Sequence, residues 1–175
     1  LERNLNLVLK TIEIGCPTVV CVNLLDEARR KGIQVDLNLL SRCLGVPVVG
    51  VVAQKKKSLQ ALLEALDHLS QANGEPLYTR YSPAVEAAVE VLQPVLKPEI
   101  AGTLNPRWLA LRLLEQNPDL LEETRKYLGK DLLTAPAVAE AIGQAEEILR
   151  AAALQGEGLK DDLVSSLVVT AQVIC

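Results

Sequence analysis

The residues whose types and spacing could do chemistry follow one apolar run near the start of the chain. Residues 18–22 read Thr-Val-Val-Cys-Val, and Asn23 and Asp26 come next in the spacing N-x-x-D. A carboxylate placed after such a strand can accept two hydrogen bonds from guanine, one from N1–H and one from the 2-amino group. Adenine offers no such pair of donors, so one acidic residue can discriminate between the bases. Asn23 and Asp26 are therefore candidate guanine-binding residues.

The same four-residue pattern has a purely structural explanation, because Asn and Asp are common turn residues after strands. The elements around it must decide between the two. Residues 1–14 carry an apolar stripe at helical spacing, and Gly15 and Pro17 stop that helix. Residues 18–22 and 46–52 are apolar and rich in valine, which predicts two buried parallel strands covered on both faces.

Helices are expected to alternate with these strands. Asp36 caps a helix that Gly45 ends, and Ser58 is predicted to cap an amphipathic helix that carries a row of leucines. The order helix, strand, helix, strand, helix predicts a partial doubly wound α/β sheet. Two strands are few for such a sheet, so we expect its N-terminal strands to precede residue 1.

The second half of the chain reads as helices only. Residues 83–96 form a helix that Pro94 is predicted to end or kink. Asn105-Pro106 and Asn117-Pro118 are start signals for two further helices, and long helices follow over 135–154 and 160–175. The fold class is therefore α/β followed by all-α, with a small helical bundle. We place the domain boundary between residues 73 and 74, giving domains of 1–73 and 74–175.

Composition narrows the classes of function. The 175 residues are 49% hydrophobic and 23% charged, as in soluble globular proteins. The net charge of −4 argues against a nucleic-acid partner. The chain contains no Met, even at position 1, so we expect it to be a fragment of a longer protein.

Little in the sequence suggests a metal centre. The four cysteines have no C-x-x-C spacing, and His68 is the only histidine. We expect Cys16, Cys21 and Cys43 to be small buried hydrophobes in a reducing compartment. Three acidic pairs lack the Glu-x-x-His spacing of iron sites in helical bundles, and we predict no metal at any of them. These pairs are Glu122-Glu123, Glu146-Glu147 and Asp161-Asp162.

Several segments, in order and spacing, resemble the bacterial ferrous iron transport protein B family, and together they cover essentially the whole chain. Residues 23–28 (Asn-Leu-Leu-Asp-Glu-Ala), with Lys-Gly-Ile at 31–33, resemble the fourth G-motif region of that family. Residues 44–49 resemble the strand that leads into its fifth motif. Residues 1–5 resemble the helix after its third motif, and residues 106–115 are similar to its Trp-Leu-Ala-Leu helix.

The resemblance implies the second half of a Ras-like GTP-binding domain, joined to a helical domain that stabilises bound GDP. The implied ligand is GTP or GDP, and the implied partner is the rest of the transporter, including its membrane domain. It implies a place on the cytoplasmic side of the bacterial inner membrane, and a homo-oligomer is left open. In the fifth motif, Ala53 keeps its place, and its backbone N–H is the implied contact to guanine O6.

The sequence departs from the family pattern where the phosphates would bind. It contains no G-x-x-x-x-G-K-S/T and no D-x-x-G, so the ligands for Mg²⁺ and the phosphate cradle are absent. Val52 replaces a serine of the fifth motif, and Lys55, Lys56 and Lys57 stand where the family has glycines. We expect the parent protein to be a GTPase and this chain alone to be inactive. The alternatives are half of another era-like small GTPase and a non-enzymatic helical interaction module.

Overall fold

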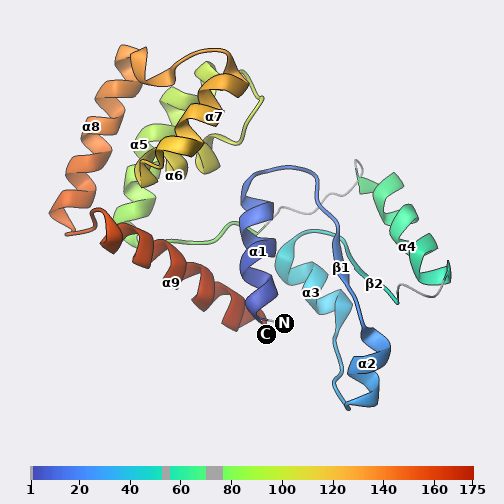
Figure 1. Cartoon of the computed structure of the whole chain (residues 1–175). Helices are drawn as coiled ribbons and strands as arrows, with labels where there is room; N and C mark the ends of the chain where they lie inside the picture. Colours follow the sequence, from blue (N-terminus) through green and yellow to red (C-terminus); the bar gives the residue numbers. More distant parts are fainter. Residues whose placement is uncertain (1, 53–55, 70–76) are drawn as a thin grey trace. The chain divides into compact units, whose positions relative to one another are not determined.

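The computed structural model describes residues 2–52, 56–69 and 77–175 (Figure 1). The chain separates into two compact units. The α/β unit comprises residues 1–78 with 173–175, and the helical unit comprises residues 79–172. The predicted boundary between residues 73 and 74 lies outside the described residues.

The α/β unit alternates helices and strands in the predicted order. Its two strands pair in parallel, with Val20 opposite Val48 and Val22 opposite Gly50, which confirms the parallel pairing. Each strand is only three residues long, because regular ladder bonds join the runs only over this stretch. The elements are α1 (Glu2–Glu13), β1 (Val20–Val22), α2 (Leu25–Arg30), α3 (Leu37–Leu44), β2 (Val48–Gly50) and α4 (Lys56–Asp67).

Local capping signals fix α3 as predicted. The Asp36 side chain accepts a hydrogen bond from the Leu39 N–H at 2.9 Å. Gly45 ends the helix in the left-handed conformation, with φ 66°, where glycine has no Cβ to clash. These contacts set the path from α2 through α3 into β2.

The expectation that both strands are covered on both faces, with buried cysteines, is wrong for the described residues. Val20 is buried, whereas Cys21 is exposed, since successive strand residues point to opposite faces. Cys16 is also exposed and Cys43 is half-buried. A valine-rich run predicts a strand reliably, but it does not reveal whether a second layer covers that strand.

The helical unit contains the predicted helices and a short 3-10 helix that the sequence did not indicate. Asn105 and Asn117 each cap a helix that begins with proline, as expected; their side chains accept bonds from backbone N–H groups at 2.9 to 3.3 Å. The elements are α5 (Pro83–Ile100), α6 (Pro106–Glu115), α7 (Pro118–Leu128), η2 (Leu132–Thr134), α8 (Pro136–Ala151) and α9 (Glu157–Ile174).

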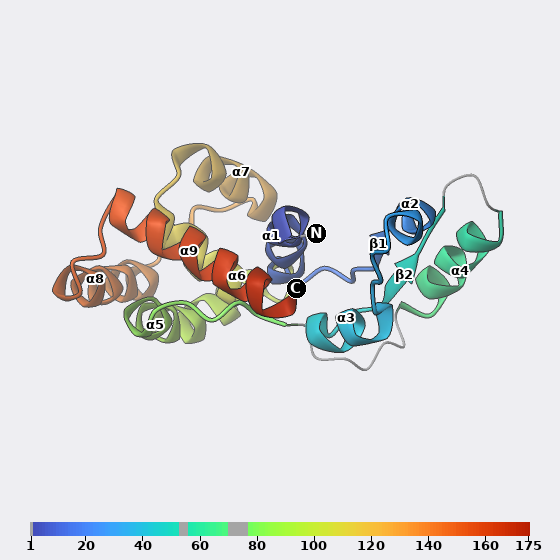
Figure 2. The same cartoon turned by 90° about the horizontal axis from the view of Figure 1, so that it is seen from below.

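In the helical unit, helix α5 packs against both α6 and α8 (Figure 2). The helix does not end at Pro94, which was one of the two outcomes predicted there, but continues through Pro94 and Pro98 to Ile100. A proline inside a helix costs about 3 kcal/mol. Each buried Leu or Val contributes about 1.5–3 kcal/mol, so the buried face of α5 outweighs that cost. The face consists of Val85, Ala88, Val89, Leu92, Leu96 and Ile100.

The core of the helical unit is aliphatic. Leu109, Ala110 and Leu111 of α6 are fully buried in it, whereas Trp108 is only partly buried and packs at its margin. In the part of the chain that the structure describes, no helix is both long and apolar enough to cross a membrane.

Candidate functional site

Asn23 follows β1 directly, and its side chain holds the turn that comes next. The Asn23 Oδ1 accepts a hydrogen bond from the Leu24 N–H at 2.8 Å. Leu24 adopts a left-handed conformation, with φ 61° and ψ 30°, which costs a non-glycine residue about 1–2 kcal/mol. The Leu24 carbonyl then accepts the Ala28 N–H at 3.0 Å, so α2 starts within this turn. Asn23 therefore stabilises a strained corner between β1 and α2.

Leu25, inside the N-x-x-D segment, anchors this corner to the neighbouring strand. A Cβ placed on Gly50 would collide with Leu25 Cδ1 and would lie 2.7 Å from Leu37 Cδ1. Because glycine has no side chain, both leucines can lie directly on the end of β2. Gly50 was not predicted from the sequence to have this role, although an isolated glycine in a strand is a signal of close approach.

Asp26 lies in the first turn of α2, with its side chain 42% exposed. Among the described residues, Asp26 forms an ion pair with Arg30, whose Nη2 is 3.8 Å from Asp26 Oδ2. That separation exceeds hydrogen-bond distance, so the ion pair leaves carboxylate lone pairs available to a ligand. The structure thus places Asn23 and Asp26 on one turn, with the carboxylate at the surface.

The exit of β2 is tied to this corner by hydrogen bonds. The Val51 N–H donates to the carbonyl of Val22, the residue before Asn23, at 2.8 Å. The Val52 N–H donates to Ser58 Oγ at 3.1 Å, and the same hydroxyl donates back to the Val52 carbonyl at 2.8 Å. Ala53, the predicted contact to guanine O6, lies outside the described residues.

The prediction that Ser58 caps α4 is wrong. The helix begins at Lys56, so Ser58 is its third residue. Its hydroxyl makes hydrogen bonds with the backbone of Val52 at the end of β2. A serine before a leucine row is a typical cap signal, but the backbone groups of Val52 compete for the same hydroxyl.

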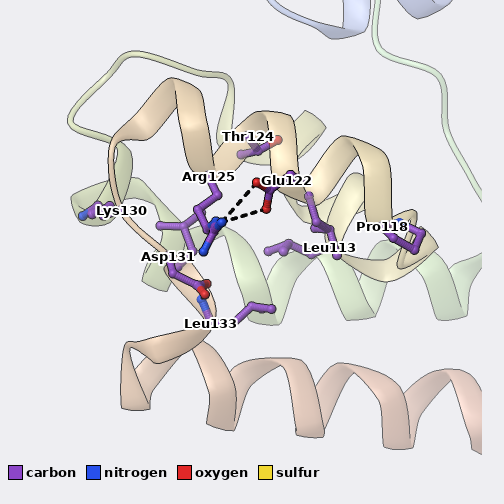
Figure 3. Close-up of a pocket in the computed structure, with 10 residues that line it drawn as sticks. Leu113, Pro118, Glu122, Thr124, Arg125, Lys130, Asp131 and Leu133 are labelled. Atoms are coloured by element: carbon purple, nitrogen blue, oxygen red, sulfur yellow. Dashed lines mark hydrogen bonds and ion pairs between the residues drawn. The ribbon is translucent and has the colours of Figure 1, made fainter.

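The helical unit has a hollow of about 230 Å³ between α6, α7 and η2 (Figure 3). Its polar side chains already have partners. Arg125 pairs with Glu122, and Lys130 pairs with Glu99 at 2.6 Å. The Asp131 carboxylate caps η2 by accepting the Leu133 N–H at 2.9 Å. With these groups engaged, the hollow offers a ligand mainly apolar contact.

A charged cluster at the start of the helical unit is structural. Arg107 makes two hydrogen bonds to the Glu86 carboxylate, at 2.7 and 2.8 Å, and one to the Thr79 carbonyl at 2.8 Å. The Tyr81 N–H also donates to Glu86. Burial alone would raise the Glu86 pKa, but the bonds from Arg107 and Tyr81 and the charges of Arg107 and Arg80 outweigh it, so the pKa is lowered. The cluster fastens residues 79–81 to α5 and α6.

Among the described residues, no group of three or more His, Cys, Asp or Glu side chains is arranged to hold a metal ion. One of the three acidic pairs is engaged along α7, where Glu122 pairs with Arg125 and Glu123 pairs with Lys126. Glu146 accepts a hydrogen bond from Gln116 at 2.6 Å.

Family models match both units. Residues 1–66 match the model described as ferrous iron transport protein B, and residues 81–173 match the model described as FeoB cytosolic helical domain. The two matches lie in the α/β unit and the helical unit, respectively.

Curated relatives and solved structures agree with these matches. The chain is 31% identical over 135 residues to the Fe(2+) transport protein A/Fe(2+) transporter FeoB fusion protein of Porphyromonas gingivalis, covering 74% of this chain and 16% of that one. It is 34% identical over 115 residues to the Fe(2+) transporter FeoB of Escherichia coli, covering 66% and 15%. The chain thus spans about a sixth of the length of these relatives.

Two solved structures have the same fold. An NFeoB mutant of S. thermophilus bound to GMPPNP matches with a TM-score of 0.78 and 23% identity, over 100% of this chain and 64% of that one. The cytosolic domain of the T. maritima FeoB iron transporter in its GDP form matches with a TM-score of 0.66 and 20% identity, over 99% and 60%. The architecture is therefore that of a partial G domain with a helical domain.

Proposed function

The chain belongs to the ferrous iron transport protein B family, and from this membership we propose that its α/β unit is the guanine-recognition corner of a nucleotide-binding domain. Asp26 reads the base, and Asn23 holds the turn that presents Asp26. The observation that carries the proposal is the Asp26 carboxylate, which is 42% exposed and beyond hydrogen-bond distance of Arg30, its ion-pair partner among the described residues.

The chemistry of guanine fits this carboxylate. Its two oxygens can accept from N1–H and from the 2-amino group, and each hydrogen bond to a charged group contributes about 1.5–3 kcal/mol. The side-chain oxygen of Asn23 accepts a hydrogen bond from the Leu24 N–H. Its amide nitrogen can donate to the nucleotide. Ala53 follows Val52 in the sequence, and we assign its backbone N–H to guanine O6.

Hydrolysis requires parts that this sequence does not contain. Phosphoryl transfer depends on a phosphate cradle and on Mg²⁺ held by conserved polar groups, and the motifs that supply both are absent from the 175 residues. The chain alone should therefore bind guanine nucleotides weakly and should not hydrolyse GTP. GTPase activity above background from the purified chain would contradict this.

For the parent protein, we propose a ferrous iron transporter of the bacterial inner membrane. We propose that this chain lies on the cytoplasmic side of that membrane. The support is the printed name of the curated relatives, Fe(2+) transporter FeoB. In that setting the α/β unit senses the guanine nucleotide and the helical unit passes its state to the membrane domain.

The test compares nucleotides that differ at one group. GDP, IDP and ADP are titrated into the chain and followed by amide chemical shifts; IDP lacks the 2-amino group, and ADP lacks both donors. We expect GDP to bind best, and Asp26→Ala to weaken GDP at least about tenfold and to abolish the preference over IDP. Glu27→Ala, which removes the neighbouring exposed charge, is the matched control and should leave the preference intact. Equal binding of all three nucleotides, or none, would favour an interaction module.

A further inference from the structure

Ser58 makes an interaction that neither the family resemblance nor the N-x-x-D pattern assigns to it. We propose that Ser58 is a positioning residue for guanine recognition, acting through Val52 and the end of β2. This inference rests on the proposed function, because it names what holds that site in shape.

The Ser58 hydroxyl makes two hydrogen bonds with the backbone of one residue, Val52. Ser58 Oγ accepts from the Val52 N–H at 3.1 Å and donates to the Val52 carbonyl at 2.8 Å. One hydroxyl thus satisfies both backbone polar groups of the residue that leaves the strand. Val52 follows β2, which ends at Gly50, so these groups have no place in the regular ladder. A single side chain from α4 replaces the ladder there.

Backbone and hydrogen bonds connect Val52 to the turn that contains Asn23 and Asp26. The Val51 N–H donates to the Val22 carbonyl at 2.8 Å. Val22 immediately precedes Asn23, whose side chain holds the Leu24 N–H. A continuous path of backbone and hydrogen bonds therefore runs from Ser58 through Val52, Val51 and Val22 to Asn23.

At Val52, the sequence departs from its family pattern. Val52 stands where the resemblance leads one to expect a serine, so the hydroxyl that would brace the fifth-motif loop is missing from that position. Ser58, six residues later, supplies a hydroxyl that contacts the same backbone. The hydroxyl that contacts this backbone therefore lies in the first turn of α4 and not at the end of the strand. It makes hydrogen bonds with both backbone polar groups of Val52.

Two variants and one control test the proposal in the full 175-residue chain. Ser58→Ala removes the hydroxyl, and Ser58→Thr keeps one at the same position. Ser41→Ala is the control: the Ser41 hydroxyl also donates to a backbone carbonyl, that of Val46, at 2.8 Å and partly buried. It lies in the same unit but at the opposite end of β2.

The first readout is hydrogen exchange of the Val52 amide, measured by NMR without nucleotide. We expect exchange to be at least about tenfold faster in Ser58→Ala, unchanged in Ser41→Ala and restored in Ser58→Thr. An equally protected Val52 amide in Ser58→Ala would overturn the brace itself.

The second readout is the affinity for GDP and for IDP. We expect Ser58→Ala to weaken GDP about fivefold, the effect of about 1 kcal/mol for one net hydrogen bond, with Ser58→Thr near wild type and Ser41→Ala unaffected. Faster Val52 exchange with unchanged GDP affinity would overturn the positioning role while leaving the proposed function intact. Absence of GDP binding by the wild-type chain would overturn the proposed function, and the positioning role with it.

Discussion

The two units of this chain have different sources of stability. The helical unit has a continuous core that runs from Tyr81 to Leu163 and is aliphatic except for Tyr81, with α5 buried along one face. The α/β unit has two three-residue strands and several exposed leucines, including Leu59, Leu63 and Leu66 of α4. Packing therefore maintains the helical unit, whereas individual contacts at the β1–α2 corner maintain the candidate site.

We expect the largest difference in stability between the two units when one leucine in each unit is truncated to alanine. Leu109 is fully buried, so Leu109→Ala should lower the free energy of unfolding of the helical unit by about 3 kcal/mol. Leu63 is 55% exposed, and Leu63→Ala should change stability by less than about 0.5 kcal/mol. Denaturant unfolding followed by the fluorescence of Trp108, the only tryptophan, reports the helical unit, and circular dichroism during the same unfolding reports the α/β unit that contains Leu63. Similar losses for both variants would remove the contrast between the units.

The second prediction concerns Gly50. In Gly50→Ala the new methyl group would collide with Leu25 and approach Leu37, and overpacking of this kind costs about 1–3 kcal/mol. We expect the α/β unit to lose about 2 kcal/mol by circular dichroism and GDP affinity to fall, because Leu25 carries Asp26 with it. Unchanged GDP affinity would mean that the two leucines shift without moving the corner.

The third prediction is a dependence on pH. Because the Glu86 pKa is lowered on folding from its ordinary value of 4.5, its contribution to stability is present above pH 4.5 and is lost as the pH falls through the folded pKa. Glu86→Gln should destabilise the helical unit by about 1.5 kcal/mol at neutral pH. It should also flatten the decline in stability below pH 4.5. Trp108 fluorescence during urea unfolding at several pH values measures both effects; an unaltered acid slope would contradict the account.

The smallest effect is expected in α8. Gly143 is helical, and a Cβ there would meet nothing within 4 Å. Gly143→Ala should therefore stabilise the helical unit by about 0.5–1 kcal/mol, through helix propensity alone. Thermal unfolding of this variant beside Gly50→Ala separates a glycine required by close packing from one that is not. Destabilisation by Gly143→Ala would show that α8 has an unrecognised close neighbour.

Local signals made much of the fold predictable. The cap at Asp36 and the Asn-Pro pairs at 105 and 117 act within a few residues, and the structure confirms each of them. Contacts between distant residues were not predictable. The continuation of α5 through Pro94 depends on its packing, and the exposure of Cys21 depends on what covers the strand.

The candidate site likewise combines local features, which can be predicted from the sequence, with contacts between distant residues, which cannot. Asn23 and Asp26 are recognisable from their spacing, because a turn after a strand is a local feature. The seat of Leu25 on Gly50 and the hydroxyl of Ser58 on Val52 join residues that the pattern keeps apart. A sequence motif can therefore name the group that reads a base without naming the groups that hold it.

The most direct test of the central claim, that Asp26 reads guanine, is a change of specificity. In Asp26→Asn, the amide oxygen can accept from N1–H while the amide nitrogen donates, so it matches the 2-oxo group of xanthine and not the 2-amino group of guanine. The dissociation constants of GDP and of xanthosine diphosphate are measured for both chains by amide chemical shifts. We expect wild type to prefer GDP and Asp26→Asn to prefer xanthosine diphosphate. An unchanged preference for GDP in Asp26→Asn would contradict it.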